Sequence, residues 1–279
     1  MHNQGIIREA NIMKKGLNAS QIKLIAIIAM TIDHVTWAIS PGTDPTWYVV
    51  ALHIIGRLTA PLMWFFIAEG GHYTRNIRKY AGRLFLFAII SHFAYNFAFG
   101  IPFVPFSNGS IFNQTSVLWS LAWAVVAIAV ARSEKYPGFL KIPTVTLLSA
   151  VGFPSDWSSI AVMCPFCLYM HRGNKKKQAF DIVFWTFIYA VVYFIFLDKL
   201  YGVLQMFTFL TLPIIALYNG ERGGRKPAKP AEGTEGGQLA VTKPSPLAKW
   251  GFYIYYPAHL VVIGIIRIVL HGNVALIFR

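Results

Sequence analysis

Long apolar stretches recur along the whole chain, and they constrain its fold more than any other feature. Each has roughly 17 to 25 residues, enough for a helix to cross about 30 Å of hydrocarbon. Only 13% of the 279 residues are charged, about half the share found in a soluble domain. The sequence therefore predicts an all-α, polytopic membrane helix bundle. We expect nine helices, at 17–40, 46–70, 79–99, 115–131, 139–153, 156–171, 179–198, 200–218 and 250–270.

Two of these segments, 139–153 and 156–171, are short for a membrane span. At 1.5 Å per residue, about 15 residues fall short of the hydrocarbon thickness. They are expected either to span with a tilt or to form a re-entrant hairpin. Both arrangements leave the outer flanks of the pair on the same side.

The basic residues alternate between loops, and this pattern predicts the topology. The net charge is +14, and 19 basic residues fall on one side of the bundle, leaving Lys199 and Arg279 on the other. The positive-inside rule then places the N-terminus in the cytoplasm and the C-terminus outside. No basic, aromatic-interleaved soluble module is present, so we expect no nucleic-acid partner. The cytoplasmic set is Arg8, Lys14, Lys15, Arg75, Arg78, Lys79, Arg132, Lys135, Lys141, Arg172, Lys175, Lys176, Lys177, Arg222, Arg225, Lys226, Lys229, Lys243 and Lys249.

The chain divides by composition into a bundle, a polar loop and a last helix. A cytoplasmic tail at 1–16 precedes the bundle at 17–219. The 220–249 loop is rich in Pro, Gly, Lys and Glu, a composition that cannot bury a core, so we expect disorder. The last helix at 250–270 leads to an external tail at 271–279.

Ionisable side chains inside the predicted helices point to a functional interior. A charge in hydrocarbon costs several kcal/mol, so such groups usually face a partner or a polar cavity. Lys23 and Arg83 lie near helix ends, where long side chains snorkel to the surface. Asp33, His34 and Arg57 lie too far from their helix ends to do so. The full set is Lys23, Asp33, His34, His53, Arg57, Glu69, Arg83, His92, His259 and Arg267.

Lys23 and His34 are expected to share one helix face. Their spacing of 11 residues is about three helical turns, or an axial distance of about 16 Å. A basic entrance leading to a buried imidazole suits a long ligand with an anionic head and a reactive tail. Coenzyme A thioesters have that shape.

Four segments resemble the TraX family, whose namesake is the membrane acetylase of conjugative pilin. They are KLIAIIAMTIDHVTW, IIGRLTAPLMWFFIAEGGHYTRNIRKYAGRLFLFAIISH, QMFTFLTLPIIALYNGERG and KWGFYIYYPAHLVVIGIIR, in order from about 17 to 267. Such proteins look like distant relatives of the acyltransferase-three membrane enzymes. These carry a basic residue and a His in the first helix, which Lys23 and His34 match, and two arginines three apart, which Arg75 and Arg78 match. The segments 101–113 and 139–153 match nothing in either family.

The resemblance implies acetyl transfer from cytoplasmic acetyl-CoA, without a metal, in the bacterial cytoplasmic (inner) membrane. The acceptor would be the N-terminal amine of an exported pilin-like protein, or a cell-surface sugar. His34 would act as the base, because an imidazole with a pKa near 6.5 suits that role at neutral pH. Asp33 would pair with Arg57 or His259 on another helix. Arg57 could instead stabilise the oxyanion.

The remaining expected site residues concern the donor. Lys23, Arg75 and Arg78 would hold the CoA phosphates at an inward-facing mouth. Lys79 would either join them or stay in a solvated basic loop, and Arg83 is also expected to bind the donor. His259 would line the thioester channel or hydrogen-bond within the bundle. The channel walls would include Met30, Trp37, Phe65 and Tyr255.

Two other functions remain open at this point. Intramembrane Asp, His and Arg could form the proton or substrate site of a transporter, although the helices show no repeated halves. Cys164 and Cys167, in the sequence CPFC, have the spacing of a redox dithiol. The zinc-protease signature HExxH and the nucleotide-binding signature GxxxxGK[ST] are absent.

Overall fold

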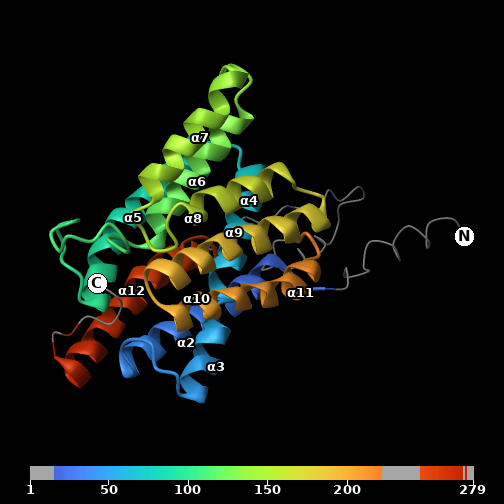
Figure 1. Ribbon diagram of the computed structural model, residues 1–279. Helices are drawn as coiled ribbons and strands as arrows, with labels where there is room; N and C mark the ends of the chain where they lie inside the picture. Colours follow the sequence, from blue (N-terminus) through green and yellow to red (C-terminus); the bar gives the residue numbers. More distant parts are fainter. Residues whose placement is uncertain (1–15, 222–245, 273, 275–279) are drawn as a thin grey trace, which may run out of the picture.

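The computed structural model describes residues 16–221, 246–272 and 274, and over these residues its regular elements are helices. Two isolated β-bridges, Leu17–Tyr218 and Thr115–Ser155, are the β-type pairings in that part of the chain. The predicted all-α class is therefore confirmed for the described residues (Figure 1).

Helices occupy all nine predicted positions, and seven of these are single helices. α2 is Ala19–Ile39, α5 is Ile77–Phe99, α6 is Val117–Arg132, α7 is Gly138–Gly152, α8 is Ile160–Met170, α9 is Lys175–Phe196 and α12 is Pro246–His271. The start of α12 corrects our expectation that the disordered loop extends to 249, because 246–249 are helical. Residues 222–245 lie outside the described residues, so the rest of that expectation stays a prediction.

The other two predicted helices, 46–70 and 200–218, are broken. The first consists of α3, Trp47–Gly56, and α4, Thr59–Tyr73. The second consists of α10, Lys199–Gln205, a 3₁₀ turn η1, Met206–Leu210, and α11, Thr211–Ala216. Each break lies just before a proline, Pro61 or Pro213. Proline has no backbone N–H, so a carbonyl four residues earlier loses its helical partner.

Local caps explain where several helices begin. The side chain of Asn18 accepts a hydrogen bond from the backbone N–H of Gln21, and the side chain of Gln21 accepts one from the backbone N–H of Asn18, which forms a capping box at the start of α2. The side chains of Asn76, Asn174 and Asp198 each accept one backbone hydrogen bond at the start of α5, α9 and α10. These caps satisfy backbone N–H groups that would otherwise lack partners.

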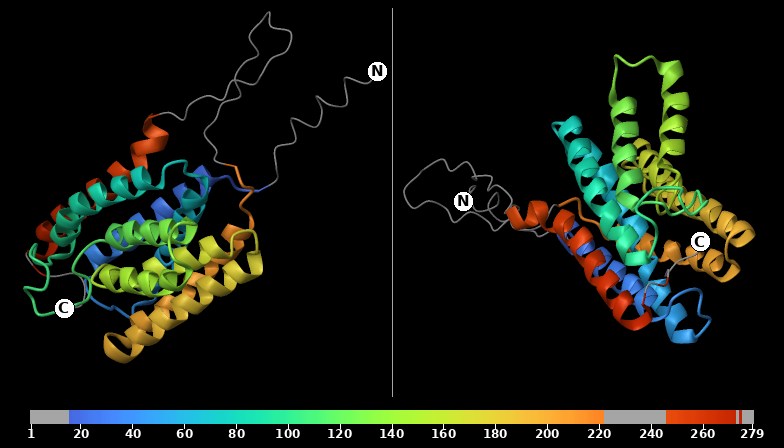
Figure 2. Two further views of the ribbon diagram at one scale, coloured as in Figure 1. Left: turned by 90° about the horizontal axis from the view of Figure 1, so that it is seen from above. Right: turned by 90° about the vertical axis from the view of Figure 1, so that its left-hand side faces the viewer.

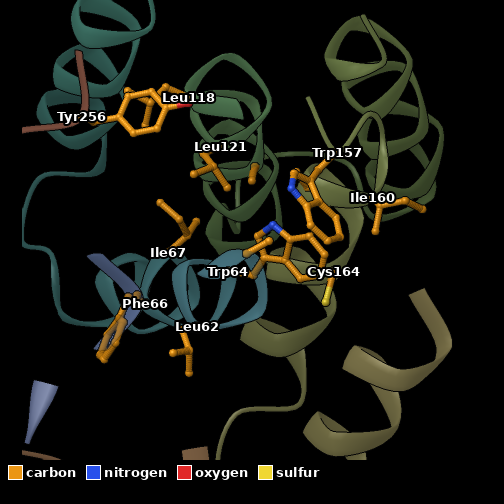
Figure 3. Close-up of a cluster of buried hydrophobic side chains, with 14 of the residues drawn as sticks. Leu62, Trp64, Phe66, Ile67, Leu118, Leu121, Trp157, Ile160, Cys164 and Tyr256 are labelled. Atoms are coloured by element: carbon orange, nitrogen blue, oxygen red, sulfur yellow. The ribbon is translucent and has the colours of Figure 1, made fainter. Parts of the chain in front are cut away.

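The helices pack around α2, α4 and α6. α12 packs against both α5 and α2, and α4 packs against α2, α6 and α8. α6 and α7 form a hairpin that is visible in the right-hand view of Figure 2. The centre of the bundle is aromatic: the rings of Trp64 and Trp157 meet edge to face with 5.2 Å between centroids (Figure 3). This packing brings the loop between α7 and α8 against α4.

Six helical segments are long and apolar enough to cross a membrane: α2, α3–α4, α5, α9, α10–α11 and α12. The outer face of α5 exposes Leu86, Ile89 and Phe93 at 54%, 58% and 54%, a continuous stripe that water would disfavour. The protein is thus of the helical membrane type. α6, α7 and α8 are shorter, so the expected count of nine spans stays a prediction, as do the sides on which the termini lie.

The charge pattern makes the topology testable by cysteine labelling. In a variant with Cys164 and Cys167 replaced by Ala, we expect Asn108→Cys, after α5, to react with a membrane-impermeant maleimide added to right-side-out vesicles. Glu134→Cys, after α6, should react only after permeabilisation, because basic loops stay in the cytoplasm. The opposite labelling pattern would overturn the orientation.

Candidate functional site

A small cavity of about 80 Å³ lies between α2, α4, α5, α6 and α12. The break between α3 and α4, the loop between α7 and α8, and one tyrosine each from α9 and α10 also line it. Two acids, one histidine and one arginine face it, and half of the other lining residues are aromatic. The lining side chains that matter below are Asp33, His34, Arg57, Asp156, Trp37, Trp64, Tyr95, Phe99, Trp157, Tyr193, Tyr201, Phe252 and Tyr256.

Asp33 and Arg57 form a buried ion pair across this wall. Nη2 of Arg57 donates to both carboxylate oxygens of Asp33, at 2.7 and 2.8 Å. Nδ1 of His53 lies 2.9 Å from the same carboxylate. Because a carboxylate only accepts hydrogen bonds, Nδ1 of His53 carries a proton. The expected pairing of Asp33 with Arg57 is therefore present.

Every N–H group of Arg57 has a partner. Nε donates to the backbone carbonyl of His53 at 3.2 Å, and Nη1 donates to the Tyr201 hydroxyl at 2.9 Å and to Gln205 at 3.2 Å. With Nη2 on Asp33, all five donors of the guanidinium are engaged. Arg57 therefore ties α2, α3 and α10 together, and it has no donor left for a substrate oxygen in this arrangement.

Gly56 allows this close approach. A Cβ atom at this position would overlap the side chain of Asp33. Gly56 thus leaves room for the carboxylate of Asp33, and the next residue, Arg57, neutralises the charge of that carboxylate. His53 lies one helical turn before Arg57, on the same face of α3.

His34 belongs to a separate chain of hydrogen bonds. Its Nδ1 lies 2.8 Å from Nε2 of His259 on α12, and Nδ1 of His259 lies 3.1 Å from the carbonyl oxygen of Tyr255. The two rings are nearly coplanar, at 4°. The hydroxyl of Tyr255 in turn lies 2.6 Å from Thr31 on α2. Of the two roles expected for His259, hydrogen bonding within the bundle is the one observed.

These contacts assign the protons on both rings. A carbonyl oxygen only accepts, so Nδ1 of His259 carries the proton, and its neutral ring keeps a lone pair on Nε2. That lone pair accepts the Nδ1 proton of His34. Nε2 of His34 is then left with a lone pair, and it makes no hydrogen bond within the described part of the chain. His34 lines the cavity, so the arrangement suits a base held by a second group.

Trp64 lines the same cavity. Its side chain is fully buried, and its indole N–H has no hydrogen-bond partner among the residues that the structure describes. A buried donor without a partner costs free energy, on the order of 1–3 kcal/mol. Unpaired buried donors in a cavity wall are candidates for binding a substrate oxygen.

The basic residues expected to hold the donor do not line this cavity. Lys23 is exposed, with its ammonium 5.0 Å from the ring centroid of Phe66. Arg75 and Arg78 are exposed around the start of α5. Arg83 lies against Tyr80, at 5.9 Å from its ring centroid. Of the four expected wall residues, Met30 and Trp37 line the cavity, while Phe65 lines a second one and Tyr255 lines neither.

A second, larger cavity of about 580 Å³ lies at the end of the bundle predicted to face the cytoplasm. Arg172 is at its edge, where Nε donates to Glu69 at 2.7 Å and Nη2 donates to Tyr73 at 2.8 Å. The hydrogen bond to Glu69 raises the pKa of Arg172. Lys23, Arg75 and Arg78 line neither this cavity nor the first.

Sequence reasoning missed two members of the site and gave the cysteines no clear role. The sequence pattern does not predict Asp156 as a site residue. The feature that could have indicated it is an isolated acidic residue between two short apolar helices. The sequence pattern indicates His53 only as a histidine inside a predicted helix. Its spacing of four residues from Arg57 could have placed it beside the ion pair, because residues four apart are neighbours on one helix face. Cys164 and Cys167 are free thiols on α8, with Cys164 buried. The described residues contain no group of three or more side chains suited to a metal.

The ion pair should behave as a unit in stability measurements. We expect Arg57→Met to lower the free energy of unfolding by about 3–5 kcal/mol, because it leaves the Asp33 carboxylate buried without a cation. Asp33→Leu combined with Arg57→Met should recover most of the loss. The measurement is thermal unfolding in detergent, with the exposed Arg78→Met as the matched control. If the double variant loses as much free energy of unfolding as the two single variants lose together, the pairing is contradicted.

Known proteins match this chain over a range that includes the whole site. The TraX protein family matches residues 18–267, from the cap of α2 into the last turns of α12, and so includes both histidines and the ion pair. The probable fimbrial assembly protein FimC, serogroup H1, of Dichelobacter nodosus is 29% identical over 256 residues, covering 88% of this chain and 94% of that protein. No solved structure matches the chain. The chain therefore belongs to the TraX family.

Proposed function

We propose that this protein is an acetyl-CoA-dependent membrane acetyltransferase in which Nε2 of His34 is the general base. The observation that carries the proposal is the hydrogen-bond chain from His34 through His259 to the Tyr255 carbonyl. It leaves a lone pair facing a cavity inside a bundle of membrane-length helices. The acceptor is the N-terminal amine of a pilin-like exported protein, with a cell-surface sugar as the alternative. Membership of the TraX family and a relative named as a fimbrial assembly protein support that acceptor.

The proposed step is direct transfer. The acceptor nitrogen or oxygen attacks the thioester carbonyl carbon while His34 takes its proton at Nε2. The new bond to carbon forms, the carbon–sulfur bond breaks, and the CoA thiolate leaves and takes the proton back from His34. His259 holds the base in one tautomer throughout. A well-placed base of this kind contributes about 10²–10⁴-fold to the rate.

Histidine substitutions test the base. We expect His34→Ala to lower acetyl transfer by at least about 10²-fold while the protein keeps its thermal stabilisation by CoA. His259→Gln should lower the rate less and shift the pH profile, because it changes the hydrogen bond that positions His34. The assay follows CoA thiol release from acetyl-CoA with a short peptide bearing a free N-terminal amine.

The exposed His72→Ala serves as the control, since His72 lies at the end of α4, outside the cavity. It should keep the full rate. Unchanged turnover in His34→Ala would overturn the assignment of the base.

Trp64 is the proposed donor to the thioester oxygen. The N–H groups of Arg57 are engaged by other side chains and the backbone, whereas the buried indole N–H of Trp64 lacks a partner within the described ranges. Negative charge develops on that oxygen during attack, and one hydrogen bond to it is worth on the order of 10²-fold in rate.

Trp64→Phe tests this role, because it keeps an aromatic ring and removes the donor. We expect a fall in kcat of on the order of 10²-fold, with little change in KM for acetyl-CoA. Trp123 is half-buried and does not line the cavity, and its indole N–H also lacks a partner among the described residues, so Trp123→Phe provides the matched control. Equal rate losses in both variants would show a packing effect instead.

A transporter remains the second candidate, and one observation favours it. Both broken helices meet at Arg57, which joins the break after α3 to Tyr201 and Gln205 on α10, and broken helices often surround transport sites. Acetyl-CoA binding separates the two proposals. An acetyltransferase should gain thermal stability with acetyl-CoA, whereas a transporter of another solute should not.

A further inference from the structure

Asp156 places a second carboxylate in the wall of the His34 cavity. It lies in the 153–159 loop between α7 and α8, away from the helices that carry Asp33 and His34. Its backbone N–H donates to the carbonyl of Thr115 at 2.9 Å, and Gln114 donates to the carbonyl of Pro154 at 2.7 Å. These bonds attach the loop to the segment that leads into α6, and so fix the position of Asp156.

The residues that follow Asp156 hold an unusual backbone conformation. Trp157 and Ser158 have φ angles of 63° and 51°, in the left-handed region that bulky residues rarely adopt. The ring of Trp157 is packed between Trp64 and Tyr189, at 5.2 and 4.8 Å between centroids. Strain of this kind persists only where the surroundings enforce it, and it gathers at functional sites. The loop is therefore built to hold its side chains in one place.

The cation that acts on Asp156 is Arg57, which is already paired with Asp33. Asp33 is neutralised by Arg57, and the five donors of Arg57 are engaged by other groups. Asp156 forms no salt bridge within the described part of the chain, although the backbone N–H of Trp157 contacts it. A carboxylate in a largely aromatic cavity favours a cation or a proton. Aromatic faces such as those of Trp157 and Tyr201 also attract cations.

We infer that Asp156 binds the ammonium group of the acceptor and makes the site selective for an amine over a hydroxyl group. The inference rests on the proposed acetyltransferase function and adds the residue that recognises the acceptor. An N-terminal amine has an ordinary pKa of about 7.7–8.0, so much of it is cationic at neutral pH. A sugar hydroxyl carries no charge and gains nothing from this carboxylate.

The step balances with Asp156 as a spectator carboxylate. The ammonium first gives one proton to water. The free amine then attacks the thioester carbonyl while Nε2 of His34 takes its second proton. The nitrogen–carbon bond forms and the carbon–sulfur bond breaks. The departing CoA thiolate takes that proton from His34, which leaves an amide, a thiol and the neutral base.

A pair of binding measurements tests the inference without relying on turnover. The probes are a short peptide with a free N-terminal amine and the same peptide acetylated at its N-terminus. We expect the wild-type protein to bind the amine at least tenfold more tightly than the acetylated form. Asp156→Asn, which keeps the shape of the side chain, should lose that preference. Asp44→Asn removes a half-buried carboxylate outside the cavity and should keep that preference.

KM measurements distinguish a role of Asp156 in binding the amine from a purely structural role. Asp156→Asn should raise KM for the amine peptide at least tenfold and leave KM for acetyl-CoA within twofold. KM for a peptide with a hydroxyl in place of the terminal amine should not change. Equal losses for both acceptors, or an amine preference that survives in Asp156→Asn, would overturn the role of Asp156. If the wild-type protein binds the amine selectively through Asp156 but transfers no acetyl group, that result would instead refute the acetyltransferase function.

Discussion

The ion pair between Asp33 and Arg57 is the interaction on which the rest of the site depends. Arg57 lies in the break between α3 and α4 and reaches both α2 and α10. An unpaired charge in hydrocarbon costs several kcal/mol, so the three elements must meet for the chain to tolerate either residue. Once Asp33 is held, the next side chain on α2, His34, is directed about 100° away. Both side chains line the cavity, but Asp33 is paired with Arg57, whereas His34 is hydrogen-bonded to His259.

Much of the fold follows from the spacing and length of apolar residues. All nine helix positions were predicted, because a long apolar run must hydrogen-bond its own backbone inside a bilayer. The two breaks were missed, although Pro61 and Pro213 signalled them through their lack of a backbone N–H. The partner of Asp33 could also be predicted, since a buried carboxylate needs a cation and Arg57 was one of two candidates.

Other parts of the site depend on how distant segments pack, which the pattern of residues does not specify. His34 and His259 are separated by 225 positions, and only the packing of α12 against α2 brings them together. Asp156 lines the cavity because the 153–159 loop folds against the bundle around Trp157, whereas in sequence it is a polar residue in a loop. Lys23, Arg75 and Arg78 are exposed. The pattern of apolar residues does not determine whether exposed basic side chains lie around a ligand.

The most direct test of the account is an experimental structure of the protein with a non-hydrolysable thioether analogue of acetyl-CoA. The acceptor atom must lie about 3 Å from both Nε2 of His34 and the carbonyl carbon. The account therefore predicts that this carbon lies roughly 5 Å from Nε2, with the His34–His259 hydrogen bond intact. An analogue bound with its acetyl group far from His34, at another group of side chains, would contradict the assignment of His34 as the base.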